Sequence, residues 1–442
     1  MSINKTILLI FLLVFSSKVC AQIRIGVALP LMNNTENKEE KKLGTEMLQG
    51  ISDAVKEHNR NNPGAKVELL TEDTQRDPAI ALEIINKFGS DKKVIAIFGP
   101  VFSSELSPNA GAADFHKIPV VTPTSTQNFL AQKNPFLFQL NPTYDIRGRT
   151  MAKFANDELK MKRFAVFSED SYGKNFAESF SDEVLKNGGS ITATVYYSKD
   201  DNDLTQELEE LEDKIFSTDK FIDFGNITKE NFDIIKSYDI KFSYPDSLKN
   251  EMLVVSIYKL FGRDADRIMD SLKLKPTASF DKSRTVIPGY TEAIYIPIST
   301  YMEIPKMISQ YFSEHINLPV LGTSDWNNKE ILEENKIYIK NLYFDSDFNL
   351  REDAETPDKL SESGIKNYFF GYDGMKLILD KISEGNKDRI SLNNALELTE
   401  NYITFHNKIT LIDRTNTELE IMRFNMGELM RLGNFKYNKL NY

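Results

Sequence analysis

Short apolar runs alternate along the chain with longer stretches in which apolar residues recur every three or four positions. The runs predict buried strands, and the longer stretches predict amphipathic helices. The first predicted strands are residues 23–29, 67–70, 94–98 and 119–121. Asp77 is the expected N-cap of one intervening helix, and another is expected from Ser103 to Phe115. Strands separated by single helices give a parallel sheet covered on both faces, so we expect a doubly wound α/β lobe.

The same rhythm starts again after Asn141-Pro142 and predicts a second α/β lobe. Further strands are expected at residues 164–167, 191–197, 292–296, 318–321 and 343–344. Helices are expected at residues 146–159, 172–186, 302–312, 369–383 and 392–402. Strand-like runs close the chain.

Residues 215–289 interrupt this alternation. Apolar spacing from Leu253 to Leu260 predicts one helix there, and Ile268 with Leu272 predicts another, separated by polar and turn-rich segments. We therefore treat residues 215–289 as an insertion in the second lobe.

The first 21 residues have the three parts of a signal peptide. Lys5 supplies the positive charge, residues 7–15 form an apolar run, and Val19-Cys20-Ala21 forms the cleavage site. Such a run is too short to cross a bilayer, which takes about 20 apolar residues. We expect cleavage after Ala21 and export to the periplasm. Lipid attachment at Cys20 is the alternative that this segment leaves open.

Composition and motifs narrow the class of protein. The formal net charge is −11, spread along the chain without a basic cluster, so we expect no nucleic-acid partner. His58, His116, His315 and His406 have no metal-ligand spacing, and the chain has no Gly-x-Ser-x-Gly elbow, phosphate loop or dinucleotide-binding glycine motif. We expect a binding protein with no metal and no cofactor rather than an enzyme.

Two loops at the carboxyl ends of predicted strands are candidate ligand contacts, because open parallel sheets bind ligands there. Ser103 and Ser104 follow a Gly-Pro turn and start a predicted helix, whose N-terminus favours a carboxylate. The next strand is followed by Thr124, Ser125 and Thr126, a turn that can present carbonyl acceptors to an ammonium group. Together the two loops predict a receptor for a zwitterion, whereas each alone is also explained as a helix cap or a structural turn.

Six segments resemble the leucine-binding type of periplasmic solute-binding protein. They are IGVALPL at 25–31, EDTQRDP at 72–78, the turn and helix at 99–115, IPVVTP at 118–123, SEDSYG at 168–173 and GYDG at 371–374. No single segment is diagnostic, but their order is. The resemblance implies a type I periplasmic binding protein fold, in which two doubly wound lobes are joined by a three-strand hinge and close around a ligand.

The expected lobe boundaries follow from this resemblance. Lobe 1 is expected at residues 22–142 and 346–402, and lobe 2 at residues 143–345 and 403–442. The chain would then cross between lobes near Asn141, near Phe344-Asp345 and near Tyr402.

The resemblance also assigns roles to individual residues. Ser103 matches a carboxylate-binding serine, and Ser125 a position whose backbone holds the ligand ammonium. Thr126 matches a threonine that helps to hold the same zwitterion. Tyr172 matches an aromatic residue of the second lobe that lies against the ligand.

Two positions of the second lobe depart from the family pattern. The second aromatic contact falls near Ser299, and the acidic partner of the ammonium falls at Ser324. Asp325 would replace that acid if the turn shifts by one residue, and Asp145 is another candidate anchor. These departures leave the ligand's identity open.

We expect, from the resemblance, a protein that captures an amino acid or related small carboxylate for an ABC-type importer of the inner membrane. A second family shares the scaffold. The turn at Gly322–Trp326 followed by Asn327-Asn328 resembles the binding-protein-like domain of penicillin-binding protein activators, which use the fold for protein interaction. Under that alternative the insertion would dock a cell-envelope partner.

Overall fold

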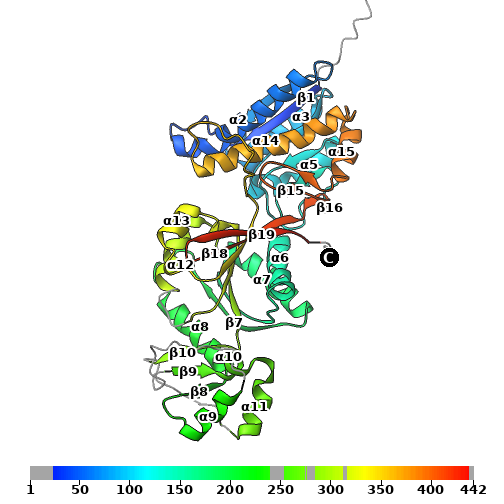
Figure 1. The fold of residues 1–442 in the computed structure, drawn as a ribbon. Coiled ribbons are helices and arrows are strands. Elements are labelled where there is room, and N and C mark those ends of the chain that lie inside the picture. The colour runs from blue at the N-terminus through cyan, green and yellow to red at the C-terminus, as the bar shows by residue number, and fades with distance from the viewer. Residues whose placement is uncertain (1–22, 239–252, 274, 276–283, 312–315, 438–442) are drawn as a thin grey trace, which may run out of the picture. The chain divides into compact units, whose positions relative to one another are not determined.

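The computed structural model describes residues 23–238, 253–273, 275, 284–311 and 316–437 (Figure 1). The chain divides into two compact units. Of the described residues, unit 1 holds those up to Asn141 and those of Leu350–Asn416, and unit 2 holds those of Pro142–Asn349 and those from Thr417 on. The expected signal peptide and Cys20 lie outside the described residues.

Unit 1 is built on a seven-stranded sheet in the order β16-β17-β5-β4-β3-β1-β2. Its strands are β1 (Ile23–Leu29), β2 (Val67–Asp73), β3 (Val94–Phe98), β4 (Val120–Thr122), β5 (Leu137–Gln139), β16 (Leu411–Ile412) and β17 (Thr415–Asn416). Neighbouring strands from β2 to β17 pair in parallel, and β16 and β17 form an antiparallel hairpin. The expected parallel sheet is confirmed, with β5 as a strand that the apolar pattern missed.

Helices cover this sheet. They are α2 (Lys38–Asn61), α3 (Pro78–Ser90), α4 (Ser103–Leu106), α5 (Ala110–His116), α14 (Glu362–Ser383) and α15 (Arg389–Glu397). The expected cap of α3 is confirmed, because the Asp77 carboxylate accepts hydrogen bonds from the N–H groups of Ala79 at 2.7 Å and Ile80 at 3.3 Å. A small hairpin of β14 (Tyr402–Ile403) and β15 (Lys408–Ile409) completes the unit.

Two helices far apart in the sequence, α2 and α14, lie side by side in unit 1 (Figure 1). A Cβ atom at Gly371 would lie 2.2 Å from the carbonyl oxygen of Met47, and one at Gly50 would lie 2.0 Å from that of Tyr368. Only glycine permits so close an approach of the two backbones. The GYDG segment is therefore a packing element here.

The aspartate of the same segment also has a structural role. Asp373 is buried, and its Oδ2 accepts hydrogen bonds from the N–H groups of Phe405 at 3.1 Å and His406 at 3.2 Å. The same oxygen lies 2.5 Å from Nδ1 of the buried His406 side chain. Asp373 thus fixes the β14–β15 hairpin to α14.

Unit 2 has its own seven-stranded sheet in the order β19-β18-β13-β12-β11-β6-β7. Its strands are β6 (Arg163–Glu169), β7 (Ser190–Tyr197), β11 (Ala293–Ile296), β12 (Val320–Gly322), β13 (Leu342–Ser346), β18 (Glu418–Asn425) and β19 (Glu428–Lys436). Its helices are α6 (Tyr144–Asp157), α7 (Tyr172–Lys186), α8 (Thr205–Ser217), α12 (Ile304–Gln310) and α13 (Lys329–Glu334). The strands from β7 to β13 are parallel, whereas β18 and β19 are antiparallel. Successive residues of β6 enter different apolar clusters, so both faces of the sheet are covered.

The third crossing between the units differs from the expected one. The chain passes from unit 1 to unit 2 after Asn416 rather than near Tyr402. Residues 408–416 stay in unit 1 because Thr415 pairs with Gln139 of β5 and extends that sheet. The two residues of β17 are too few to show an apolar pattern, so the sequence does not predict this pairing.

The insertion is a small subdomain of unit 2. In its described residues a three-stranded sheet in the order β10-β9-β8 packs with the helices α9, α10 and α11. The elements are β8 (Phe221–Asp223), α9 (Lys229–Ser237), β9 (Leu253–Ser256), α10 (Ile257–Phe261), α11 (Ala265–Leu272) and β10 (Thr285–Ile287). The helix expected from Leu253 is wrong, since Leu253 lies in a fully buried strand and the helix starts at Ile257. The β-branched Val254 and Val255 favour the strand.

Asp219 joins the two ends of the insertion. Its Oδ2 accepts hydrogen bonds from the N–H groups of Gly289 at 2.8 Å and Tyr290 at 2.9 Å. Its Oδ1 accepts one from the Ser256 hydroxyl at 2.6 Å. Burial raises the pKa of Asp219, against these hydrogen bonds, which lower it. The subdomain thus leaves and re-enters unit 2 at one point.

Within the described residues, no helix is both long enough and apolar enough to span a bilayer.

Arg389 provides a test of how unit 1 is held together. Its guanidinium donates to the carbonyl oxygens of Phe88, Gly89, Asp91, Val94 and His116, at 2.7–3.4 Å. We expect Arg389→Leu to lower the free energy of unfolding by about 2–4 kcal/mol, because buried carbonyls lose their donor. Urea denaturation followed by circular dichroism measures this change. The matched control, Arg60→Leu at an exposed position of α2, should change it by less than about 0.5 kcal/mol. Equal effects of the two substitutions would refute this role of Arg389.

Candidate functional site

The candidate loops of unit 1 lie next to each other at the carboxyl edge of its sheet, because β3 and β4 are neighbours. The Gly99-Pro100 turn leads from β3 to Ser103. Gly99 has φ +85°, and a Cβ atom there would lie 2.0 Å from the carbonyl oxygen of Ala28. Glycine is therefore required where this loop leaves the sheet.

Ser103 is the centre of this half-site. Its Oγ lies 2.8 Å from Ser125 Oγ and accepts hydrogen bonds from the N–H groups of Thr126 and Gln127, each at 3.3 Å. Ser103 and Thr126 are half-buried, Ser125 is buried and Ser104 is exposed. The structure thus brings Ser103, Ser125 and Thr126 together, with two backbone donors converging on one oxygen.

The carbonyl groups of the same turn have other partners. Gln139 Nε2 donates to the carbonyl oxygens of Ser125 and Gln127, at 3.1 Å each, and the Thr124 hydroxyl donates to Val101 O at 2.7 Å. The turn therefore directs acceptors inward to Gln139 and donors toward Ser103.

The single helix expected from Ser103 to Phe115 is wrong. The structure has the four-residue helix α4, a 3-10 turn at Ser107–Asn109 and then α5. Pro108 has no N–H group and cannot continue the backbone hydrogen bonds of an α-helix. A four-residue helix contributes little dipole, so the donors of this half-site come chiefly from the loop at residues 126–127.

Glu105 is the third residue of α4, two positions after Ser103. It is buried, and its Oε2 accepts a hydrogen bond from the Phe102 N–H at 3.2 Å. Burial raises the pKa of Glu105. Its role is to fix the residue before Ser103.

Tyr172 begins α7 at the carboxyl edge of the unit 2 sheet. It is 36% exposed, and its ring packs at a steep angle against Tyr144 and Phe176. Glu169 Oε1 accepts the Gly173 N–H at 2.8 Å and so holds the start of the helix. Tyr172 is thus a partly exposed aromatic side chain at the carboxyl edge of the unit 2 sheet.

Arg147 lies at the same edge of unit 2 and binds several of its polar groups. It was not singled out from the sequence. It is 2% exposed, and its Nη1 donates to Ser324 Oγ at 2.5 Å and Asp345 Oδ1 at 3.0 Å. Its Nη2 donates to Asp347 Oδ2 at 2.8 Å, and its Nε donates to Pro142 O at 3.2 Å. The sequence signal was an arginine in the buried stripe of α6, which also carries Met151 and Phe154.

The charged groups around Arg147 shift one another's pKa values. Burial lowers the pKa of Arg147, but the carboxylates of Asp347 and Asp345 hold it above its ordinary value. Burial raises the pKa of Asp345 from 3.8 to about 7, although Arg147 counteracts it. Within the described residues Asp345 Oδ2 has no hydrogen-bond partner, which adds to the cost of the ionised form.

Three other positions singled out from the sequence lie in unit 2, where Asp145 and Ser299 form hydrogen bonds. Asp145 Oδ1 accepts a hydrogen bond from Arg149 Nε at 2.8 Å, and Asp325 is half-buried. Ser299 lies between two buried carboxylates, with its Oγ 3.2 Å from Glu169 Oε2 and 3.0 Å from Glu303 Oε1. Ser299 therefore belongs to a polar network where the resemblance implies an aromatic contact.

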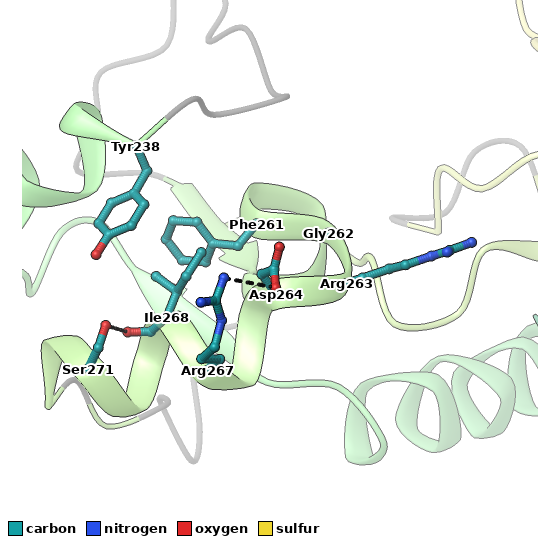
Figure 2. A pocket seen from close by; sticks show the side chains of 8 residues that line it. All are labelled: Tyr238, Phe261, Gly262, Arg263, Asp264, Arg267, Ile268 and Ser271. Atoms are coloured by element: carbon teal, nitrogen blue, oxygen red, sulfur yellow. Dashed lines mark hydrogen bonds and ion pairs between the residues drawn. The ribbon is translucent and has the colours of Figure 1, made fainter.

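A hollow of about 770 Å³ lies on the insertion, away from all of these residues. Its lining residues are Tyr238, Phe261, Gly262, Arg263, Asp264, Arg267, Ile268 and Ser271. Figure 2 shows Arg267 paired with Asp264 and Arg263 pointing away from the aromatic side chains. Arg263, Asp264 and Arg267 are exposed to solvent, so the described lining of this hollow has no buried polar group that would fix a ligand. Among the described residues no group of three or more His, Cys, Asp and Glu side chains is placed to hold a metal ion.

The raised pKa of Asp345 predicts how the stability of unit 2 depends on pH. Between pH 4 and 7 the folded state keeps this proton and the unfolded state has lost it, so stability falls as pH rises. From pH 5 to pH 8 we expect the free energy of unfolding to fall by about 1–4 kcal/mol more in the wild type than in Asp345→Asn. The fluorescence of the single tryptophan, the buried Trp326 of unit 2, reports the transition. Parallel pH profiles for the two proteins would contradict the prediction.

Two comparisons of the sequence with known proteins give matches. Residues 22–218 match the family model described as periplasmic binding protein. A curated amino acid binding protein from Pseudomonas aeruginosa is 22% identical over 345 residues, which cover 71% of this chain and 88% of the relative.

Solved structures show the same fold. A branched-chain amino acid transporter substrate-binding protein from Streptococcus pneumoniae, in complex with isoleucine, is 18% identical with a TM-score of 0.54, over 94% of this chain and 99% of that chain. An ABC transporter substrate-binding protein from Sphaerobacter thermophilus is 15% identical with a TM-score of 0.63, over 94% and 98%. A solute-binding protein from R. palustris, in complex with 4-hydroxybenzoate, is 14% identical with a TM-score of 0.57, over 94% and 97%. The chain therefore has the type I periplasmic binding protein fold, and the resemblance to the leucine-binding type is confirmed.

Proposed function

We propose that this chain is an exported solute-binding protein that captures an amino acid or related small carboxylate. The observation that carries the proposal is the convergence of the Thr126 and Gln127 N–H groups on Ser103 Oγ. At 3.3 Å these hydrogen bonds are longer than the usual 2.9–3.0 Å. A carboxylate oxygen is a stronger acceptor than a hydroxyl. It would accept from these two N–H groups in place of Ser103 Oγ and form shorter hydrogen bonds.

The similar proteins support this ligand class. The bound molecules named for two of them, isoleucine and 4-hydroxybenzoate, both carry a carboxylate. Ser103 and Ser125 would bind that group through their hydroxyls, together with the loop donors. From unit 2 we propose Tyr172 as an aromatic contact of the ligand. Of the remaining predicted residues, Ser104 and Thr124 border the carboxylate site, and Asp145, Ser324 and Asp325 belong to the unit 2 edge.

The proposal includes transport rather than catalysis. Several similar structures are substrate-binding proteins of ABC transporters, so an inner-membrane ABC importer is the proposed partner. The periplasm is the proposed compartment, because the N-terminal segment has the pattern of a cleaved signal peptide.

Binding measurements on refolded mature protein test this function. A thermal-shift screen against amino acids, other small carboxylates, peptides and sugars finds the ligand, and calorimetry gives its affinity. We expect a carboxylate to bind and Ser103→Ala with Thr126→Ala to weaken it at least about tenfold, since one charge-assisted hydrogen bond contributes about 1.5–3 kcal/mol. Ser90→Ala, an exposed serine of α3, is the matched control and should leave the affinity unchanged. Unchanged affinity in the double variant would refute the site.

One observation favours a second function, a cell-envelope interaction module. The insertion has its own sheet and its own apolar cluster around Phe224, Leu253 and Leu260. It joins unit 2 at the amino edge of the sheet, where Arg163, the first residue of β6, donates to the Tyr290 carbonyl at 2.6 Å. The insertion would then dock a protein partner without taking part in ligand binding.

Deleting the insertion separates the two functions. Because Asp219 contacts Gly289 directly, a short Gly-Ser linker can replace residues 220–288. We expect the deletion protein to keep its carboxylate binding and its unfolding midpoint, measured by Trp326 fluorescence. The full chain should capture a cell-envelope partner, and the deletion protein should not. Loss of carboxylate binding in the deletion protein, with Trp326 still in a folded environment, would contradict this division.

A further inference from the structure

We propose that one edge of unit 1 docks onto an anionic lipid surface. This edge lies at the amino ends of β1, β3 and β4, opposite the edge that carries Ser103 and Ser125. The proposal therefore involves unit 1 alone and does not depend on the ligand loops. The docking surface, which we call the basic edge, consists of Lys92, Lys93, Phe115, Lys117, Lys387 and Ile390.

One guanidinium brings the segments of the basic edge together. Arg389 donates to the carbonyl oxygens of Asp91 at 2.7 Å and His116 at 2.9 Å, and its Nε donates to that of Val94 at 2.9 Å. Three segments that are far apart in the sequence thus meet at the start of β3. The surface residues adjoin these contacts: Lys92 and Lys93 follow Asp91, Phe115 and Lys117 flank His116, and Lys387 and Ile390 lie within two residues of Arg389.

Two apolar side chains protrude from the basic edge. Phe115, near the end of α5, is 81% exposed, and Ile390, in the first turn of α15, is 50% exposed. In water such exposure is unfavourable. An aromatic and an aliphatic side chain beside lysines are typical of surfaces that insert into the headgroup region of a bilayer.

Cations outnumber acids at this edge, although the whole chain has a net charge of −11. His116 senses the positive potential, because burial and then the charges of Arg389 and Lys92 lower its pKa. Anionic lipid headgroups complement such a surface. The acids near it already have partners in unit 1: Glu68 and Asp91 pair with Arg24, Asp114 pairs with Lys117, and Asp388 accepts the N–H groups of Ile390 and Ser391.

The start of the chain favours a membrane over an acidic protein as the partner. The Arg24 N–H donates to the Lys93 carbonyl at 3.1 Å, so β1 begins at the basic edge. Ile23 opens β1 only three residues after Cys20, a reach of about 10 Å at most. Whether the leader is cleaved after Ala21 or Cys20 is lipidated, the membrane-directed end of the chain adjoins this edge.

Sedimentation of the refolded full mature chain with vesicles tests the proposal. Vesicles of equal parts phosphatidylglycerol and phosphatidylcholine should bind the protein at low salt, and vesicles of phosphatidylcholine alone should not. Added salt should weaken the binding, because it screens the lysines from the headgroups. Lys92→Glu with Lys93→Glu should lower the partition coefficient at least about tenfold. Phe115→Ser should lower it at least about threefold.

A tryptophan at the surface reports insertion directly. The emission of Phe115→Trp should shift to shorter wavelength when the anionic vesicles are added, whereas Trp326 is already buried in the protein. Circular dichroism checks that substitutions at these exposed positions leave the fold intact. An unshifted emission would overturn the proposal.

Two matched controls make the result specific to the basic edge. Lys38→Glu with Lys42→Glu changes the net charge equally at the start of α2, at the opposite edge, and should leave the partition coefficient nearly unchanged. Leu398→Ser removes a side chain as exposed as Phe115, but one that adjoins Glu397 and lies two residues before Glu400, and it should also have little effect.

Three outcomes contradict the proposal. Equal losses in the two lysine double variants would assign the binding to net charge alone, and absence of binding to the anionic vesicles would exclude a lipid partner. If immobilised poly-glutamate, but not the vesicles, retains the chain through Lys92 and Lys93, the basic edge binds an acidic polypeptide instead. Carboxylate binding is measured separately, so the proposed function stands or falls independently of these results.

Discussion

A parallel sheet with apolar helices on both faces leaves its edges as the places where polar groups meet solvent. Both units of this protein obey that constraint. At the carboxyl edge of unit 1, neighbouring strands bring Ser103 and Ser125 within 2.8 Å, although 22 residues separate them in the chain. At the carboxyl edge of unit 2, Tyr172, Ser299 and Arg147 follow or face the ends of β6, β11 and β13. The chemistry of the protein depends on which of these edge groups satisfy one another and which remain for a ligand.

The two edges divide their hydrogen-bonding capacity differently. Unit 1 turns carbonyl oxygens inward to Gln139 and converges N–H groups on Ser103, so it offers donors. Unit 2 collects carboxylates and neutralises part of their charge with the buried guanidinium of Arg147. A buried ion pair of this kind contributes little net stability, because desolvating the charges offsets their attraction. Its consequence is positional, since one guanidinium holds α6 to Ser324, Asp345 and Asp347.

The insertion folds around a core of its own and is not part of either large sheet. It has an apolar cluster of its own and is attached through one short stretch, where Asp219 receives N–H groups from Gly289 and Tyr290. The ring of Tyr290 also lies 4.8 Å from the Arg163 guanidinium, in a cation–π contact that ties the subdomain to the amino edge of unit 2. The insertion thus joins unit 2 at the edge of the sheet opposite the one where Tyr172 and Ser324 lie.

The sequence by itself determined the class of fold, because strands and helices of a covered parallel sheet carry strong apolar patterns over many residues. It also determined which loops follow the strands, and hence Ser103, Ser125 and Thr126 as neighbours. It could not determine the strand at Leu253, the short β17 pairing or the break at Pro108, since each depends on a few residues whose conformation is set by contacts elsewhere. Nor could it determine the partners of Arg147. Ser324, Asp345 and Asp347 lie 177 to 200 residues away in the chain, and only the packing of α6 against β13 brings them to one guanidinium.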